Sequence, residues 1–85
     1  MPEQSEKAVH VRYFAILREQ RGLVEETITT RSATAVELYA ELQARHHFSL
    51  SQNFVKVSVN NTFQPMNTPL HDQDLLVFIP PVAGG

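Results

Sequence analysis

The feature of this 85-residue sequence that most restricts its fold is one amphipathic helix set among short β-type segments. Thr34 and Glu37 match a capping box, which predicts Thr34 as the N-cap of a helix that runs to about His46. Apolar residues recur along this helix at the three-to-four spacing of one buried stripe: Ala35, Leu38, Tyr39 and Leu42. One such stripe can cover one face of one sheet.

The other apolar segments alternate as half-buried strands do. In residues 8–14 one face would carry Val9, Val11 and Tyr13, and the other His10, Arg12 and Phe14. Further strands are expected over 24–30, 55–60, 62–64 and 75–79, with a short helical turn that stops at Gly22 and a tight turn at Asn60-Asn61. With the second strand antiparallel to the first, and the last adjacent and parallel to it, this order predicts an α+β β-grasp, or ubiquitin-like, fold.

The chain is expected to have three parts: a disordered leader over 1–7, the β-grasp domain over 8–79 and a flexible Gly-Gly tail over 80–85. The leader lacks the apolar segment of a signal peptide, and no stretch approaches membrane-spanning length. We therefore expect a cytoplasmic protein.

Composition argues against several functional classes. The chain has no cysteine, so thiolate catalysis and disulfides are excluded, and its net charge of -2 gives no basic surface for nucleic acid or membrane. The four histidines do not have metal-ligand spacing, so no metal or bound cofactor is expected. No serine lies in a nucleophile elbow and no phosphate-binding loop is present, so a self-contained active site is not expected.

The last strand predicts an apolar surface on the open face of the sheet. If Leu76 and Phe78 face the helix, Leu75, Val77 and Ile79 must face the other way. A sheet covered on one side is usually polar on its open side, but here that side would carry Val77, Ile79 and Phe14. Such a patch indicates a partner-binding surface. The alternative is that loops 15–22 and 61–69 fold over it.

The sequence ends in Pro80-Pro81-Val82-Ala83-Gly84-Gly85. The prolines stiffen this tail, and six extended residues at roughly 3.3 Å each reach about 20 Å, enough to enter a deep pocket of another protein. Gly84 and Gly85 have no Cβ and allow an enzyme wall to approach closely. These residues predict that the Gly85 carboxylate is a reacting group; an inert end is the alternative.

Several segments along the chain resemble a known family, and the Pro-Pro-Val-x-Gly-Gly ending is the most specific part of the match. The chain resembles the small subunit of molybdopterin synthase over nearly everything from residue 8 onward. The segments that carry the resemblance are Val11 to Ala15 with Leu17-Arg18-Glu19, Thr34 to Leu42, Val59-Asn60, Pro69-Leu70-x-Asp72-x-Asp74, and Ile79 with the Pro-Pro-Val-x-Gly-Gly ending. Two positions depart from the family pattern. Gln73 stands between two acidic residues, where the family often has glycine. Asn61 follows Asn60 at a position where some members have glycine.

The resemblance implies a sulfur carrier, a non-catalytic subunit of a sulfurtransferase. An E1-like enzyme would use ATP to adenylate Gly85, and the acyl-adenylate would become a thiocarboxylate. Its sulfur would pass to cyclic pyranopterin monophosphate in a heterotetramer with the large synthase subunit. Family contacts at Phe14 and Ile79, the open face and the tail together give the expected partner-binding set: Phe14, Val77, Ile79, Pro80, Pro81, Val82 and Ala83.

Three alternatives stay open. The thiamin-pathway sulfur carrier shares the fold and the Gly-Gly ending, but is usually shorter and lacks the Pro-Pro pair. A ubiquitin-like modifier would be conjugated to lysines of target proteins. A plain interaction domain would keep its function without Gly84 and Gly85.

Overall fold

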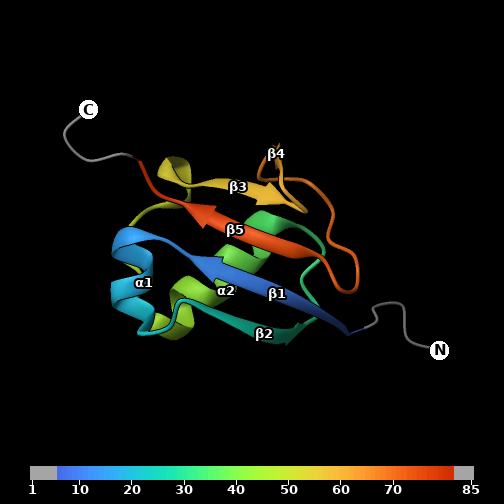
Figure 1. Ribbon diagram of the computed structural model, residues 1–85, viewed down its shortest axis with the longest axis horizontal. Coiled ribbons are helices and arrows are strands. Elements are labelled where there is room, and N and C mark those ends of the chain that lie inside the picture. Colours follow the sequence, from blue (N-terminus) through green and yellow to red (C-terminus); the bar gives the residue numbers. More distant parts are fainter. Residues whose placement is uncertain (1–5, 82–85) are drawn as a thin grey trace.

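The computed structural model describes residues 6–81, in which a mixed five-stranded sheet curves around one main helix (Figure 1). The elements in chain order are β1 (Lys7–Tyr13), α1 (Ala15–Arg21), β2 (Glu25–Thr30), α2 (Ala35–His46), the 3-10 helix η1 (Gln52–Phe54), β3 (Lys56–Val59), β4 (Thr62–Gln64) and β5 (Leu75–Ile79). The strand order is β2-β1-β5-β3-β4. β1 and β5 are parallel and the other pairs antiparallel, so the predicted β-grasp fold is confirmed.

Two parts of the predicted chain organisation extend beyond the described residues. Positions 1–5 of the expected leader and 82–85 of the expected tail lie outside the structure. Lys7, also assigned to the leader, pairs with Thr30 at the start of β1. Within residues 6–81, no helix has the length and apolar character needed to cross a membrane.

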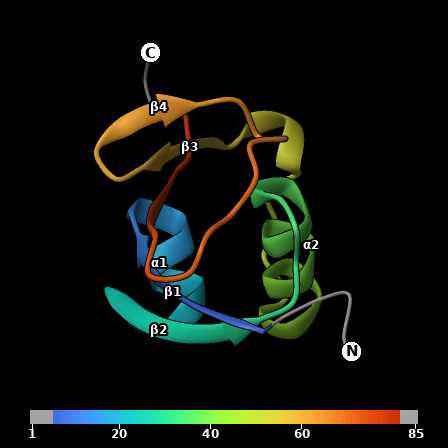
Figure 2. The ribbon, with the colours of Figure 1, turned by 90° about the vertical axis from the view of Figure 1, so that its right-hand side faces the viewer.

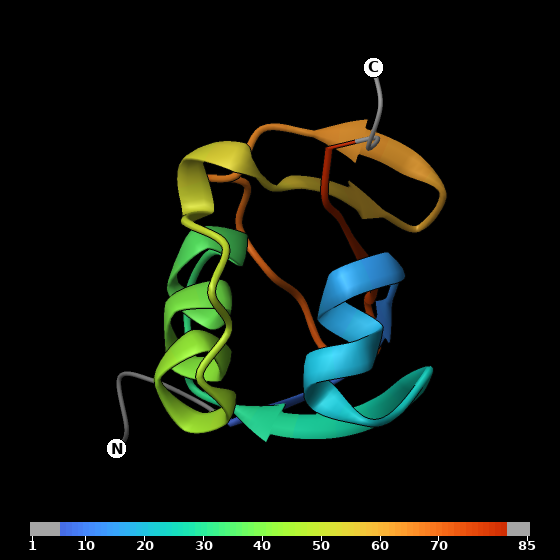
Figure 3. The same ribbon diagram turned by 90° about the vertical axis from the view of Figure 1, so that its left-hand side faces the viewer.

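The core lies between the concave face of the sheet and α2. Figure 2 shows α2 along one side of the curved sheet, and Figure 3 shows α1 at the end of the molecule that faces the viewer. Ten large side chains of this core are fully buried: Val9, Val11, Tyr13, Leu17, Leu38, Tyr39, Leu42, Val57, Leu76 and Phe78. The alternation predicted for the first and last strands and the apolar stripe of α2 are therefore confirmed.

The start of α2 follows the predicted capping box with one difference. The Thr34 side chain accepts a hydrogen bond of 3.3 Å from the Glu37 backbone N–H, as an N-cap should. The Glu37 carboxylate reaches back to the N–H of Ala33 (2.9 Å) rather than to that of Thr34. The first interaction pairs an N–H of the first helical turn, which has no partner within the helix, and the second pairs the N–H of the residue before the N-cap. Together they fix where α2 begins.

Candidate functional site

An apolar hollow lies where β5 ends. Its volume is about 460 Å³, and we call it the tail-end hollow; it is lined by Phe14, Ala15, Ile16, Leu50, Ile79, Pro80 and Pro81. These residues come from the β1–α1 corner, the segment between α2 and η1, and the end of β5. No lining residue is titratable, so the hollow is suited to binding an apolar surface rather than to acid–base or nucleophilic chemistry.

The β1–α1 corner holds one side of the hollow in an unusual backbone conformation. Phe14 is extended (φ -124°), and Ala15 then turns into the left-handed region with φ 53°. The Phe14 carbonyl accepts hydrogen bonds from the N–H groups of Leu17 (3.1 Å) and Arg18 (3.4 Å), which starts α1. Leu17 is fully buried, whereas Phe14 and Ile16 remain 44% and 38% exposed. The corner therefore anchors α1 in the core and leaves two large apolar side chains facing solvent.

The structure brings together four of the seven residues expected to bind a partner. Phe14, Ile79, Pro80 and Pro81 line the same hollow, with Ile79 half-buried, Pro80 buried and Pro81 exposed. Two more, Val82 and Ala83, lie outside the described residues, as do Gly84 and Gly85.

Val77 differs from the expectation of an exposed side chain. It faces the open side of the sheet, because its pairing partners there are Arg12 on β1 and Ser58 on β3, but it is only 9% exposed. β5 is the central strand, so side chains of both neighbouring strands lie beside Val77. Ile79 lies at the end of the same strand and stays partly open. The exposed apolar surface is therefore concentrated at one end of the sheet.

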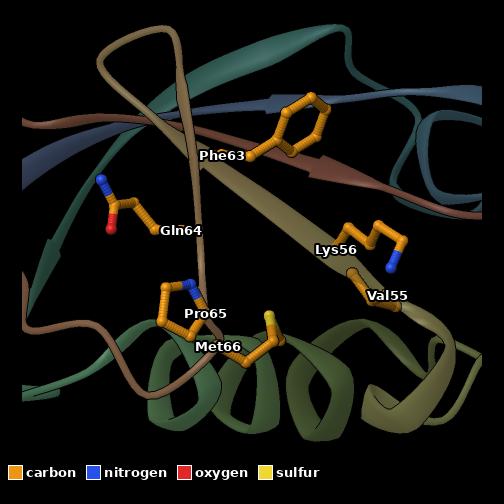
Figure 4. Close-up of a pocket in the computed structure, with 6 residues that line it drawn as sticks. All are labelled: Val55, Lys56, Phe63, Gln64, Pro65 and Met66. Carbon is orange, nitrogen blue, oxygen red and sulfur yellow. The ribbon is translucent and has the colours of Figure 1, made fainter.

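A second hollow, which the sequence analysis did not identify, lies beside β3 and β4. This β3–β4 hollow has a volume of about 490 Å³ and is lined by Val55, Lys56, Phe63, Gln64, Pro65 and Met66 (Figure 4). Figure 4 shows the Phe63 ring pointing away from α2, and the side chain is 67% exposed. Lys56 pairs with Ile79, so the two hollows are neighbours across one strand pair. A three-residue strand has too little alternation for sequence analysis to assign Phe63 to a face.

An ionic cluster ties the end of α1 to β2. Arg21 donates two hydrogen bonds to the Glu26 carboxylate (2.7 and 2.8 Å), and the Tyr13 hydroxyl donates a third (2.7 Å). The hydrogen bonds from Arg21 are the main reason that the pKa of Glu26 lies below its ordinary value. Burial, aided by the hydrogen bond to Glu26, raises the pKa of Tyr13. Every member of the cluster has a partner, so it fastens α1 rather than serving as a reactive site.

The structure shows no candidate metal centre among residues 6–81, since no three His, Cys, Asp or Glu side chains gather there. His10 instead lies within hydrogen-bonding distance of Thr27 (3.0 Å) and Gln73 (3.2 Å) on the outer face.

Comparison with known protein families identifies one that matches this chain. The model of the ThiS family matches residues 11–85, which is most of the chain and includes the tail. No curated protein sequence matches significantly.

Three solved structures share the fold with 27–29% sequence identity. The putative molybdopterin converting factor, subunit 1, from Pyrococcus furiosus is 29% identical with a TM-score of 0.73, over 89% of this chain and 99% of that one. A chain in the complex of subunits 1 and 2 of molybdopterin-converting factor from Helicobacter pylori 26695 is 29% identical with a TM-score of 0.60, over 92% and 99%. A chain of the BexX/CysO complex from Amycolatopsis orientalis is 27% identical with a TM-score of 0.64, over 91% and 99%.

Proposed function

Since this chain belongs to the ThiS family, we propose that it is a sulfur carrier and, more specifically, the small subunit of molybdopterin synthase. The working group is the carboxyl group of Gly85, with Gly84 providing the slender backbone that passes into a partner. The β-grasp domain presents this tail and binds the proteins that catalyse adenylation and sulfur transfer. Those proteins are an E1-like adenylating enzyme and the large synthase subunit, with which the chain forms a heterotetramer.

The observation that carries this proposal is the tail-end hollow. Phe14 and Ile79 lie beside Pro80 and Pro81, directly before the residues proposed to enter a partner. An apolar partner side chain seated there would fix the position of Pro80 and Pro81, whose rings restrict the backbone directly before the proposed entry into the partner. The 29% identity with the Pyrococcus furiosus subunit supports the molybdopterin pathway, and the Helicobacter pylori complex supports a second subunit as the partner.

The chemistry requires help from other proteins at each step. A free carboxylate is a poor acyl electrophile, so it must first gain a good leaving group. The Gly85 carboxylate gains one by attacking the α-phosphorus of ATP, which releases pyrophosphate and forms the acyl-adenylate. A sulfide equivalent then displaces AMP from the acyl-adenylate and leaves a thiocarboxylate. In the large subunit the sulfur would displace an oxygen substituent from a carbon of cyclic pyranopterin monophosphate, which leaves Gly85 joined to the substrate as a thioester. Water would then cleave the acyl carbon–sulfur bond, so that the sulfur stays on the substrate and the Gly85 carboxylate is released. The partner's contribution is positioning of the sulfur and the substrate.

Intact mass spectrometry tests the first half of this proposal. After incubation with an activating enzyme, ATP and a sulfur donor, the protein should exchange one oxygen for sulfur at Gly85. The Gly85→Ala variant should show reduced exchange or none, because the added Cβ obstructs the narrow approach. A variant lacking Gly84 and Gly85 is the second control. Support of molybdenum-cofactor synthesis in cells by that truncated variant would refute the proposal.

A second candidate is a sulfur carrier that serves another acceptor, which the 27% identity with a chain of the BexX/CysO complex favours. The thiocarboxylated protein should be incubated with the large molybdopterin synthase subunit and cyclic pyranopterin monophosphate. Formation of the dithiolene product supports the first candidate. Stable thiocarboxylate without product supports another acceptor, such as that of the thiamin pathway. A ladder of heavier adducts in cell extract would instead identify a protein modifier.

A further inference from the structure

We propose that Gln20 is a positioning residue of the tail-end hollow. Its side chain joins α1, which carries Ala15 and Ile16, to the segment that carries Leu50. The inference rests on the proposed function, since it concerns how well the hollow fits the large subunit. Gln20 does not itself line the hollow, so the inference extends the proposed binding site to a residue behind its surface.

The link consists of two hydrogen bonds between one amide and one serine. The Gln20 Nε2 group donates to Ser49 Oγ (2.9 Å), and the Ser49 backbone N–H donates to Gln20 Oε1 (3.1 Å). Ser49 directly precedes Leu50, and the residues joined are 29 positions apart in sequence. An amide that donates and accepts at once fixes both the separation and the relative orientation of the two segments.

The Leu50 segment is fastened to α2 independently of Gln20. The Leu50 carbonyl accepts hydrogen bonds from the Tyr39 hydroxyl (2.6 Å) and from Gln43 Nε2 (3.2 Å). The side of the hollow formed by Leu50 is therefore part of the α2 framework. Gln20 then sets where α1 stands relative to that framework.

The other anchors of α1 reach different parts of the molecule. Leu17 is buried in the core, and Arg21 binds Glu26 on β2. Among residues 6–81, the side-chain hydrogen bonds that join α1 to the Leu50 segment are those of Gln20. Loss of Gln20 should therefore leave α1 folded and attached, but free to shift where it faces Leu50. Both bonds lie at exposed positions, so their net contribution to folding is small.

The test compares Gln20→Ala with Gln20→Glu. The carboxylate of Gln20→Glu can accept from both the Ser49 N–H and the Ser49 hydroxyl, so it keeps the link, whereas Gln20→Ala removes it. We expect Gln20→Ala to weaken binding to the large molybdopterin synthase subunit by about five-fold, and Gln20→Glu to stay within about two-fold of wild type. Ser49→Ala should weaken binding in wild type but add little in the Gln20→Ala background, because the pair acts as one unit.

Amide hydrogen exchange of Ser49 in the free proteins provides a readout that needs no partner. Exchange should be faster in Gln20→Ala and close to wild type in Gln20→Glu. Faster exchange with unchanged affinity in Gln20→Ala would overturn the inference while the proposed function stands. If wild type itself fails to bind the large subunit, the proposed function fails, and the inference with it. Should Gln20→Ala prove unfolded by circular dichroism, Ser49→Ala takes its place, and affinity for the large subunit decides, because the backbone N–H of residue 49 can still donate to Gln20 in that variant. Unchanged affinity in Ser49→Ala would then overturn the inference.

Discussion

The two ends of β5 lie in opposite kinds of surroundings. At its start the buried Asp74 carboxylate accepts hydrogen bonds from Asn60 Nδ2 (2.9 Å) and from the His71 N–H (2.8 Å), and the Leu75 N–H donates to Asn60 Oδ1 (3.0 Å). At its far end Ile79 and Pro80 border the tail-end hollow, whose lining is apolar and open. These ends lie at opposite sides of the molecule in Figure 1.

The difference between the two ends of β5 separates residues that stabilise the fold from residues available to bind a partner. The polar end is complete within the chain, and among residues 6–81 no buried side-chain nitrogen or oxygen lacks a hydrogen-bond partner. The tail end leaves Phe14 and Ile16 exposed, although burying apolar surface is the main favourable term in folding. Surface of this kind becomes favourable only when a partner covers it. Changes at the polar end should therefore affect stability, and changes at the tail end should affect binding.

The largest effect is expected from Asp74→Ala at the polar end. The change removes two charge-assisted hydrogen bonds and leaves the Asn60 amide without its acceptor, so the free energy of unfolding should fall by about 3 kcal/mol. Urea denaturation measures this loss. Asp72→Ala is the matched control, because within residues 6–81 the Asp72 carboxylate accepts only exposed bonds, from the Ala8 N–H (2.8 Å) and from Gln73 Nε2 (3.4 Å). Its loss should cost no more than about 1 kcal/mol. Equal losses in the two variants would contradict the proposed importance of the buried network.

Ile79→Asp tests the tail end. A carboxylate beside Phe14 and Pro81 would have to be desolvated in the complex, so affinity for the large subunit should fall by at least about 30-fold. The domain itself should stay folded, as judged by circular dichroism. Leu75→Asp is the control, since Leu75 is also half-buried on the open face of β5 but lies at the polar end. Its affinity should change little, and a comparable loss of binding would break the distinction between the ends.

Acid should loosen the attachment of α1. The pKa of Glu26 is lowered in the folded protein by its hydrogen bonds to Arg21, so the carboxylate contributes stability above its ordinary pKa of 4.5. That contribution is lost as the pH falls from 4.5 through the lower folded value. Urea denaturation at several pH values should show a smaller acid-induced loss in Glu26→Gln than in wild type. The difference should be smaller than the effect of Asp74→Ala, and parallel curves would show that another carboxyl group dominates.

Elements with regular periodicity were predictable from the sequence. Alternation identified the faces of β1 and β5, and the Thr34 capping signal fixed the start of α2. The same alternation placed Phe14 and Ile79 on the open side, and the structure brings both to one hollow. Local pattern sufficed because each of these features depends on residues within one element.

Features that depend on packing between distant segments were not predictable. The near-complete burial of Val77 depends on its neighbours in β1 and β3. The link from Gln20 to Ser49 joins residues far apart in sequence and has no local motif. Ala15 has no side-chain property that signals its positive φ of 53°. These features appear only once the tertiary arrangement is known.

The smallest expected effect comes from the turn between β3 and β4, at the polar end of β5. Two neighbouring asparagines in this turn separate the contribution of side-chain hydrogen bonds from that of backbone conformation. Asn60 and Asn61 both have positive φ, 51° and 73°, but only Asn60 has side-chain hydrogen bonds in the network around Asp74. Glycine adopts such φ values without steric cost, so Asn61→Gly should raise the free energy of unfolding by about 0.5 kcal/mol.

Asn60→Gly relieves the same backbone but should lower that free energy by about 1–2 kcal/mol, because Asp74 and the Leu75 N–H lose a partner. Urea denaturation of both variants distinguishes the two contributions. Opposite signs would show that the side-chain network, rather than the turn conformation, stabilises the polar end. A gain in both variants would mean that backbone strain outweighs the network, and the polar end would no longer explain how the start of β5 is held.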